Sequence, residues 1–287
     1  MWLLPLALVA GVVLFKLTCF VLALYETVNL PEARHSRLTP GGLAAALGGF
    51  SVEIAGVLVL LAAWPLGLLP WIPPRRLGAG ERLPLVFVPG WSMNRGCLWL
   101  LRHRLRRDGW PHATGLNYRT RRGDMQRAAE QLRDLVERTC SATGAARVVL
   151  IGHSMGGLIC RAYLKDYGGL DRVASVITLG TPHQGSRICA LSLDPMVHEM
   201  RPESPFLEQL GRDDPIPGAV DFTAIYSSFD HMVVPAGHGY YAGVGNIVVE
   251  GVGHNGLLWS RRVYDLVREN LEYGSVREVE STATGPA

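Results

Sequence analysis

The chain has 287 residues, a formal net charge of +3 and 48% hydrophobic residues. So small a charge does not indicate a nucleic-acid-binding protein. The five cysteines are odd in number and contain no CxxC pair, which argues against a disulfide framework or a structural zinc site. Residues 1–72 are very apolar, whereas residues 75–287 have the composition of a soluble domain large enough to bury its own core.

Two apolar runs, residues 2–24 and 54–72, occupy the N-terminal quarter. The first is long enough to cross a hydrocarbon core of roughly 30 Å, and Lys16 toward its end could extend its ammonium group to the lipid headgroups. The second run follows Glu53 and contains two prolines near its end. Residues 1–72 are therefore predicted to be a membrane anchor with two transmembrane helices.

Two other arrangements of this segment are open: one transmembrane helix with a re-entrant or interfacial second run, and a cleaved signal peptide. The signal peptide is disfavoured because no positive charge precedes Lys16. Two crossings would leave both termini on one side, with Arg34 and Arg37 in the connecting loop and more arginines after the second run. The positive-inside rule then favours a cytoplasmic catalytic domain. The expected location is a bacterial inner membrane, with the chain as a multi-pass protein.

Short β-type runs alternate with helix-type stretches after a linker at residues 73–83. The candidate strands are residues 85–88, 114–118, 148–152, 173–179, 222–226 and 247–249. The candidate helices are residues 125–140, 155–167 and 257–271. This alternation predicts an α/β domain at residues 84–272 with a mostly parallel sheet covered on both faces. The polar residues 273–287 are expected to form a flexible tail.

A lid-like insertion, residues 182–219, interrupts this alternation between the fourth and fifth candidate strands. It is far longer than an ordinary connection, and long connections often carry function. Its apolar side chains could form a lid or the wall of an acyl-chain site, and a plain cap without gating is the alternative. The candidate substrate-binding residues are Met196, Met200, Phe206 and Leu207.

A catalytic serine is predicted at Ser154, in the sequence Gly-His-Ser-Met-Gly at residues 152–156. A β-branched apolar run ends directly before this pattern, and a helix-type segment begins directly after it. A serine at such a turn has its hydroxyl held out at the carboxyl edge of the sheet, and the glycines permit the close backbone approach that the turn needs. The pattern in this context predicts an activated serine nucleophile.

A serine nucleophile needs a base and an acid that orients the base, and in α/β enzymes with this turn they follow the serine in the order acid, then histidine. Asp230 comes just after the candidate strand 222–226, and His254 just after 247–249, so both should lie at the carboxyl edge. Asp221 precedes its strand and should lie at the opposite edge. The other histidines considered as bases or site-edge residues are His153, His183, His231 and His238.

Two backbone amides are expected to bind the oxyanion of a tetrahedral intermediate. One is the amide of Met155, directly after the nucleophile. The other is the amide of Trp91 in the loop after the first strand, with Ser92 as the alternative. The residues Pro-Gly-Trp at 89–91 could instead form an ordinary turn.

Five motifs in order resemble those of the bacterial triacylglycerol lipase and esterase families of the α/β-hydrolase superfamily, close to the PGAP1-like group. They are Val-Phe-Val-Pro-Gly-Trp at 86–91, Gly-His-Ser-Met-Gly-Gly at 152–157, Gly-Thr-Pro-His-Gln-Gly at 180–185, Asp-His-Met-Val-Val-Pro at 230–235 and Gly-His at 253–254. The resemblance covers roughly residues 84–271 and implies hydrolysis of carboxylic esters. It departs at Pro89, where many of these lipases carry histidine, and the N-terminal apolar pair is not part of the soluble lipases' pattern.

The expected function is a membrane-anchored lipase or esterase in which Ser154, His254 and Asp230 act on a lipid or acyl ester through an acyl-enzyme. No metal-ligand spacing or phosphate-binding loop indicates a cofactor, and no nucleic-acid partner is expected. One rival function is an acyltransferase that uses the same three residues. A second is an inactive membrane scaffold, against which the intact serine, aspartate and histidine positions argue.

Overall fold

The computed structural model describes residues 3–29, 40–70, 72–78, 80–118 and 124–283. The loop expected to carry Arg34 and Arg37 lies outside the described residues, as do the last four residues of the expected tail.

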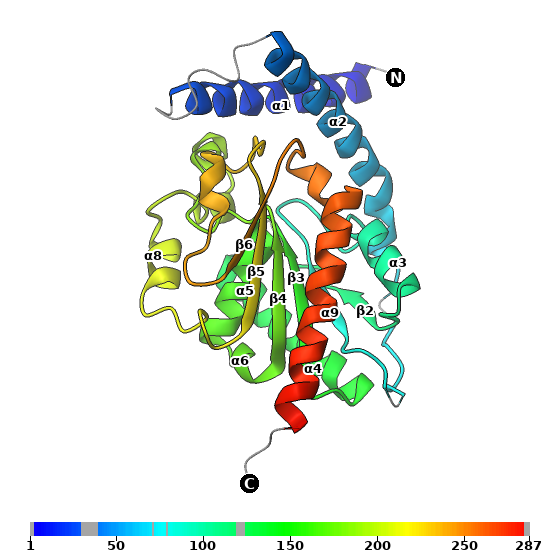
Figure 1. The fold of residues 1–287 in the computed structure, drawn as a ribbon. Coiled ribbons are helices and arrows are strands. Elements are labelled where there is room, and N and C mark those ends of the chain that lie inside the picture. Colours follow the sequence, from blue (N-terminus) through cyan, green and yellow to red (C-terminus); the bar gives the residue numbers. More distant parts are fainter. Residues whose placement is uncertain (1–2, 30–39, 71, 79, 119–123, 284–287) are drawn as a thin grey trace.

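Within these residues, a six-stranded parallel sheet forms the centre of the molecule (Figure 1). Its strand order is β2-β1-β3-β4-β5-β6, so the chain starts near one edge and then winds across to the other. The strands are β1 (Leu85–Val88), β2 (Ala113–Gly115), β3 (Val148–His153), β4 (Val173–Leu179), β5 (Asp221–Ser227) and β6 (Gly245–Val249). The α/β class and the parallel sheet predicted from the sequence are confirmed.

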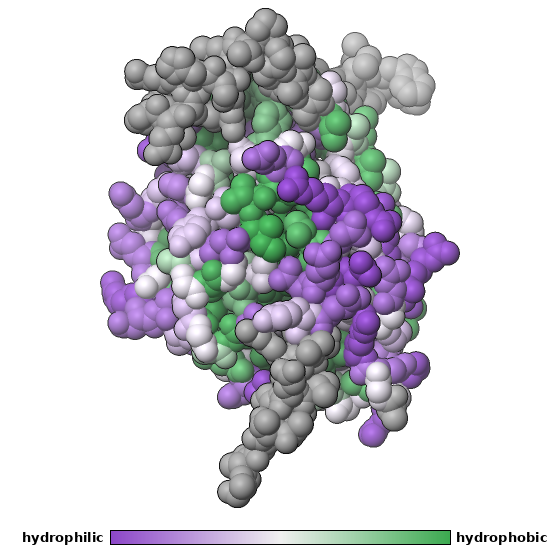
Figure 2. All heavy atoms as spheres, viewed as in Figure 1, coloured by the Kyte–Doolittle hydropathy of each residue, from purple (hydrophilic) through white to green (hydrophobic). Residues whose placement is uncertain are grey.

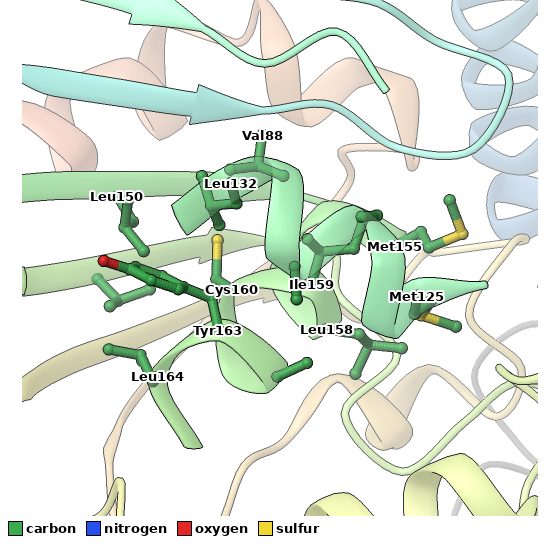
Figure 3. Close-up of a cluster of buried hydrophobic side chains, with 14 of the residues drawn as sticks. Val88, Met125, Leu132, Leu150, Met155, Leu158, Ile159, Cys160, Tyr163 and Leu164 are labelled. Carbon is green, nitrogen blue, oxygen red and sulfur yellow. The ribbon is translucent and has the colours of Figure 1, made fainter. Parts of the chain in front are cut away.

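Successive side chains of each strand point to opposite faces of the sheet, and a layer of helices covers each face. Val88 and Leu150 belong to the face covered by α4 (Met125–Thr143) and α5 (Met155–Asp166), where Figure 3 shows the apolar cluster between them. Helix α4 begins after Asp124, whose side chain accepts a backbone N–H at 2.6 Å in the manner of an N-cap. This layer therefore anchors the start of α5, which directly follows the predicted serine.

Phe87 and Ile151 belong to the opposite face, which α3 (Trp99–Arg107) and α9 (Arg261–Ala283) cover. No sequence pattern indicates α3, because basic residues surround its few apolar positions. The helix predicted at residues 257–271 begins later and ends later in the structure: α9 runs from Arg261 to Ala283, so most of the expected flexible tail is helical. The shorter elements are α6 (Gly169–Arg172), η2 (Arg187–Leu191), α7 (Pro195–His198), α8 (Pro205–Gly211), η3 (Ala236–Gly239) and η4 (Asn255–Leu258).

The N-terminal segment forms α1 (Leu3–Asn29), α2 (Pro40–Ala63) and a 3₁₀ helix, η1 (Trp64–Leu68). Figure 1 shows α1 lying across the top of the α/β domain, while α2 descends along its side toward α3. Among the described residues, one helical stretch, Phe50–Leu68, is long and apolar enough by length and composition to cross a membrane, with a mean hydropathy of 1.9. Figure 2 shows hydrophilic residues on both flanks of this face of the domain, with a hydrophobic patch between them.

Lys16 does not reach outward as the sequence suggests. Its side chain is only 8% exposed, because α1 turns it toward the α/β domain, where its ammonium nitrogen lies 3.2 Å from Nε2 of His231. Contact with lipid headgroups is therefore replaced by contact with the protein. The N-terminal helices pack on the domain with polar as well as apolar groups.

Candidate active site

Ser154 lies at the turn between β3 and α5 with φ 53° and ψ −126°. A positive φ is uncommon for a residue with a Cβ atom, and it is the mark of a serine held on a strained strand-to-helix turn. The amide of Ser154 donates to the carbonyl of Leu179 at 2.9 Å, which ties the turn to the end of β4. The strand, turn and helix that the sequence predicts around this serine are present.

Glycines let the backbone close around this turn. A Cβ atom on Gly156 would lie 2.1 Å from the carbonyl oxygen of Val88, and one on Gly157 would lie 2.1 Å from Oγ1 of Thr181. A Cβ atom on Gly152 would lie 2.7 Å from the Cα atom of Gly157. Because these approaches leave no room for a side chain, larger residues would push α5 away from the sheet and displace the serine.

Asp230 and His254 follow β5 and β6, and the fold brings them together: Nδ1 of His254 donates to Oδ2 of Asp230 at 2.7 Å. The other carboxyl oxygen of Asp230 accepts the amides of Met232 and Val233 at 2.7 and 2.9 Å. Burial alone raises the pKa of Asp230, but the charge and hydrogen bond of His254 outweigh burial and leave that pKa below its usual value. With Nδ1 donating, Nε2 is the nitrogen of His254 that can accept a proton. The rival Asp221 begins β5, at the opposite edge of the sheet.

The other histidines of this region have structural partners. His183 bonds the hydroxyl of Thr178 at 3.0 Å, and His238 bonds a backbone carbonyl of the insertion at 2.9 Å. His153 lies with Nε2 3.3 Å from the carbonyl of His254, and burial lowers the pKa of His153 to about 3. These rings therefore have structural roles around the site, and none of the three pairs with Asp230.

The loop after β1 passes directly beside the serine. A Cβ atom on Gly90 would lie 3.0 Å from the Cβ atom of Ser154, and Trp91 and Ser92 line the same cavity as the serine. The hydroxyl of Tyr118 holds this loop by donating to two of its carbonyls at 2.7 and 2.9 Å. The loop predicted to supply one oxyanion amide is thus next to the nucleophile.

Met155, predicted to supply the second amide, is the first residue of α5. Its side chain is buried in the cluster of Figure 3, so only its backbone is available at the turn. A helix N-terminus also favours negative charge, as the macrodipole requires. The two predicted amides therefore belong to the two segments that meet at Ser154.

Ser154 and His254 line a cavity of about 340 Å³ whose walls are mostly apolar. This volume lies at the lower end of ligand pockets, which range over roughly 300–1,000 Å³. In the part of the chain that the structure describes, no three His, Cys, Asp or Glu side chains group as metal ligands.

The N-terminal helices supply one wall of this cavity, and this wall is not predicted from the sequence. The lining residues from α1, α2 and η1 are Phe15, Lys16, Val57, Leu60, Leu61 and Trp64. The signal present in the sequence is a lone charge within the first apolar run, Lys16, and one directly before the second, Glu53, because an ionisable residue in an apolar helix usually faces a polar partner.

The insertion forms another part of the wall, but not through most of the residues predicted to bind substrate. Met200 lines the cavity together with Ile188. Met196, Phe206 and Leu207 do not line it and instead pack on the apolar cluster around α4 and α5. The reason is that the short helices of the insertion turn their apolar faces toward this core.

Comparisons with known proteins agree with the fold. A family model of the alpha/beta hydrolase fold matches residues 89–203. The chain is 53% identical over 57 residues to a triacylglycerol lipase of Pseudarthrobacter phenanthrenivorans, covering 20% of this chain and 17% of that protein. It is 26% identical over 184 residues to the GPI inositol-deacylase of Candida albicans, covering 58% of this chain and 42% of that protein. Among solved structures, the mature form of a Bacillus licheniformis lipase matches with a TM-score of 0.59 and 17% identity, over 69% of this chain and 95% of that one.

These matches show an α/β-hydrolase fold in this chain, and the resemblance drawn from the sequence motifs is confirmed. Within that fold, its sequence relatives carry the names of triacylglycerol lipases and of a GPI inositol-deacylase. The chain spans less than half the length of these relatives.

Proposed function

We propose that the chain is a membrane-associated serine hydrolase of carboxylic esters, with a lipid or acyl ester as its substrate. The observation that carries the proposal is that Ser154, on its strained turn, shares one apolar cavity with His254, which is hydrogen-bonded to Asp230. A nucleophile, a base and an acid that orients the base are the groups that acyl transfer needs. The names of the relatives, lipases and a deacylase, support the same chemistry.

In this mechanism Nε2 of His254 takes the proton of the Ser154 hydroxyl as its oxygen attacks the ester carbonyl. Asp230 keeps Nδ1 of His254 as a donor and stabilises the imidazolium that forms. The amides of Trp91 and Met155 donate to the oxyanion. The imidazolium then protonates the leaving alkoxide, so the alcohol departs and an acyl-enzyme remains. Water that gives its proton to His254 hydrolyses the acyl-enzyme and restores Ser154.

The lining of the cavity favours an acyl chain over a polar acyl group. Val57 and Leu60 from α2 face the same space as Ile188 and Val197 from the insertion. Each buried methylene of a chain contributes about 0.8 kcal/mol, so apolar walls bind a chain through its length. A volume of about 340 Å³ supports one such chain at a time.

The outer face of the N-terminal helices supports membrane association. The large apolar side chains of this face, and of the residues that follow η1, are exposed: Leu14, Leu17, Val21, Val52, Leu58, Val59, Leu68, Leu69 and Ile72. Exposed apolar surfaces of this extent usually mark a membrane or a protein contact. Because the same helices line the cavity, a lipid could pass from the bilayer to Ser154 without crossing bulk water.

Two membrane crossings with a cytoplasmic catalytic domain, as the sequence suggests, are the finer form of this proposal. A reporter fused after Ala287 tests the orientation, and activity on the far side of the membrane would overturn it. Extraction with alkaline carbonate tests the crossing itself, since helices that only lie in the interface should be released.

Ser154→Ala tests the proposed activity. We expect hydrolysis of p-nitrophenyl esters to fall by roughly 10⁴-fold or more, with loss of labelling by a fluorophosphonate probe and an unchanged melting temperature. Full residual activity would contradict the role of Ser154. A competing alcohol in the same assay distinguishes the rival activity, because an acylated alcohol as the main product would identify an acyltransferase.

A further inference from the structure

The carboxyl group of Glu53 is buried where α2 meets the loop that carries His254. Glu53 is 1% exposed although its helix is otherwise apolar. Its Oε2 accepts the amide of Asn255 at 3.1 Å, and its Oε1 accepts the amide of Gly256 at 2.9 Å. Both carboxyl oxygens are therefore used by the two residues that directly follow the histidine of the site.

These two amides are the first donors of η4, whose N-cap residue is His254. The first amides of a helix have no acceptor within the helix, and a side chain at the N-cap often supplies one. The N-cap side chain makes no such bond here, since His254 turns to Asp230 instead. Glu53 supplies the acceptor from a distant part of the chain and so fixes the backbone that carries His254.

Gly253, on the other side of His254, is fitted to the same carboxyl group. A Cβ atom at this position would lie 2.3 Å from Oε1 of Glu53 and 2.5 Å from its Cγ. Only a residue without a side chain allows the loop to approach Glu53 this closely. The loop is thus held against α2 both before and after the histidine.

A second polar contact joins α1 to the loop that carries the acid. Nζ of Lys16 donates to Nε2 of His231 at 3.2 Å, and His231 directly follows Asp230. The same Nε2 atom lies 3.7 Å from Oε2 of Glu53. Burial first, and then the charge of Lys16, lower the pKa of His231 to about 3, so its neutral ring can accept from the lysine. The acid loop and the base loop are therefore held from the same pair of helices.

We propose that Glu53 is a positioning residue for the catalytic base: by accepting the amides of Asn255 and Gly256, it holds His254 in register with Ser154 and Asp230. The proposal rests on the proposed function. A buried carboxyl group is costly to place, and an apolar residue of similar size would fill the space without that cost. The two carboxyl oxygens of Glu53 accept directional hydrogen bonds, and such bonds fix the geometry of the loop in a way that an apolar contact cannot.

Glu53→Gln tests this role in the full-length protein, assayed in detergent micelles with a p-nitrophenyl ester. The variant keeps the shape of the side chain, but its NH₂ group then faces a backbone amide. We expect kcat to fall on the order of 100-fold, because a displacement of about 1 Å at a catalytic group costs that much. KM should change little, since Glu53 does not line the cavity.

Glu26→Gln is the matched control. Glu26 also joins an N-terminal helix to the α/β domain, through a 2.7 Å ion pair with Arg187, but not beside His254. It should leave both kcat and the rate of fluorophosphonate labelling unchanged. A loss of activity common to both variants would mean that any weakened helix contact impairs the enzyme, and would contradict a specific role for Glu53.

Gly253→Ala gives a second route to the same displacement, and it decides the matter if Glu53→Gln does not fold. Its added methyl group pushes the loop from Glu53 and leaves α2 unchanged, so the same loss of kcat is expected. The proposal is overturned if a folded Glu53→Gln or Gly253→Ala variant keeps the wild-type kcat, even with a lower melting temperature. A wild-type protein that hydrolyses no ester would instead overturn the proposed function, and it would do so before any variant is made.

Discussion

Ser154 is held in a backbone conformation that a residue with a side chain rarely adopts. Conformations of this kind cost of order 1–3 kcal/mol and persist only where the surroundings leave no alternative. Here the surroundings are the two glycines that follow, Gly156 and Gly157, whose Cα atoms are pressed against β1 and Thr181. The carbonyl of Leu179 fixes the serine's own amide. The backbone strain thus lies at the residue whose hydroxyl the proposed chemistry uses.

Asp230→Asn should reduce kcat strongly without unfolding the protein. The asparagine keeps the shape, but its NH₂ group can face Nδ1 of His254 and favour the wrong tautomer of that ring. We expect kcat to fall on the order of 10³–10⁴-fold with little change in KM, as for an acid that orients a catalytic histidine. Steady-state kinetics with a p-nitrophenyl ester measures both constants.

Asp221→Asn is the control for this variant, because Asp221 begins the same strand at the opposite edge of the sheet. It should keep the wild-type kcat. An Asp230→Asn enzyme within about tenfold of the wild type would exclude Asp230 as the acid of the site.

At the scale of elements, Gly56 allows α2 to pack closely against Trp259, the residue directly after η4. A Cβ atom on Gly56 would lie 2.2 Å from the ring of Trp259, so Gly56→Ala should force the helix and the ring apart. Overpacking of this kind typically lowers the free energy of unfolding by about 1–3 kcal/mol. The displaced segment lies directly after the turn that carries His254, so the site should be disturbed as well. We expect a lower melting temperature together with a lower kcat.

Gly11→Ala on α1 is the matched substitution, because nothing lies within 4 Å of a Cβ atom there. It should leave kcat unchanged and can only raise helix propensity, since alanine is the better helix former. If Gly56→Ala behaves like Gly11→Ala in both measurements, the close contact between α2 and Trp259 does not matter to the site.

Local patterns were sufficient to predict the sheet and the order of the site residues. The run Val173–Leu179 forms β4 as predicted, and Asp230 and His254 follow their strands at one edge, because a parallel sheet collects the carboxyl ends of its strands. The wall formed by α1 and α2 could not be predicted in this way. Its contacts join residues far apart in the chain, such as Lys16 and His231. In addition, an apolar run has the same sequence pattern whether lipid or protein covers it.

At the scale of the whole molecule, acid should destabilise the fold because His153 and His231 are buried as neutral rings. Burial is the main cause that lowers both pKa values from 6.5 to about 3. In the unfolded chain the rings regain a pKa near 6.5, so between these values the unfolded state binds protons that the folded state does not. Stability is therefore full above about pH 6.5 and is lost as the pH falls toward 3.

Melting temperatures of the full-length protein across this range measure the effect. We expect a steady decrease from about pH 7 to pH 5, well above the range in which carboxyl groups titrate. A constant melting temperature over that interval would mean that these rings take up protons in the folded state.

The N-terminal helices contact each loop of the site, so they are expected to be part of the enzyme and not only its proposed membrane anchor. Asn94 in the loop after β1 donates to the carbonyl of Trp64 at 2.9 Å, Phe229 beside the acid packs edge-on against Phe20, and Glu53 holds the base loop. An anchor that only tethers a soluble domain would need none of these contacts.

Removal of residues 1–72 should therefore impair the α/β domain even in solution. The truncation opens one wall of the cavity, uncovers the cluster that contains Leu60, and replaces Glu53 by water at the amides after His254. We expect kcat/KM for a soluble ester to fall on the order of 100-fold, because water cannot hold the loop as a fixed side chain does. Kinetics and melting of the truncated and full-length proteins measure the difference, and co-expression of residues 1–72 as a separate chain should restore activity in part. A truncated domain that matches the full-length enzyme in kcat and melting temperature would show that the helices serve only to tether it.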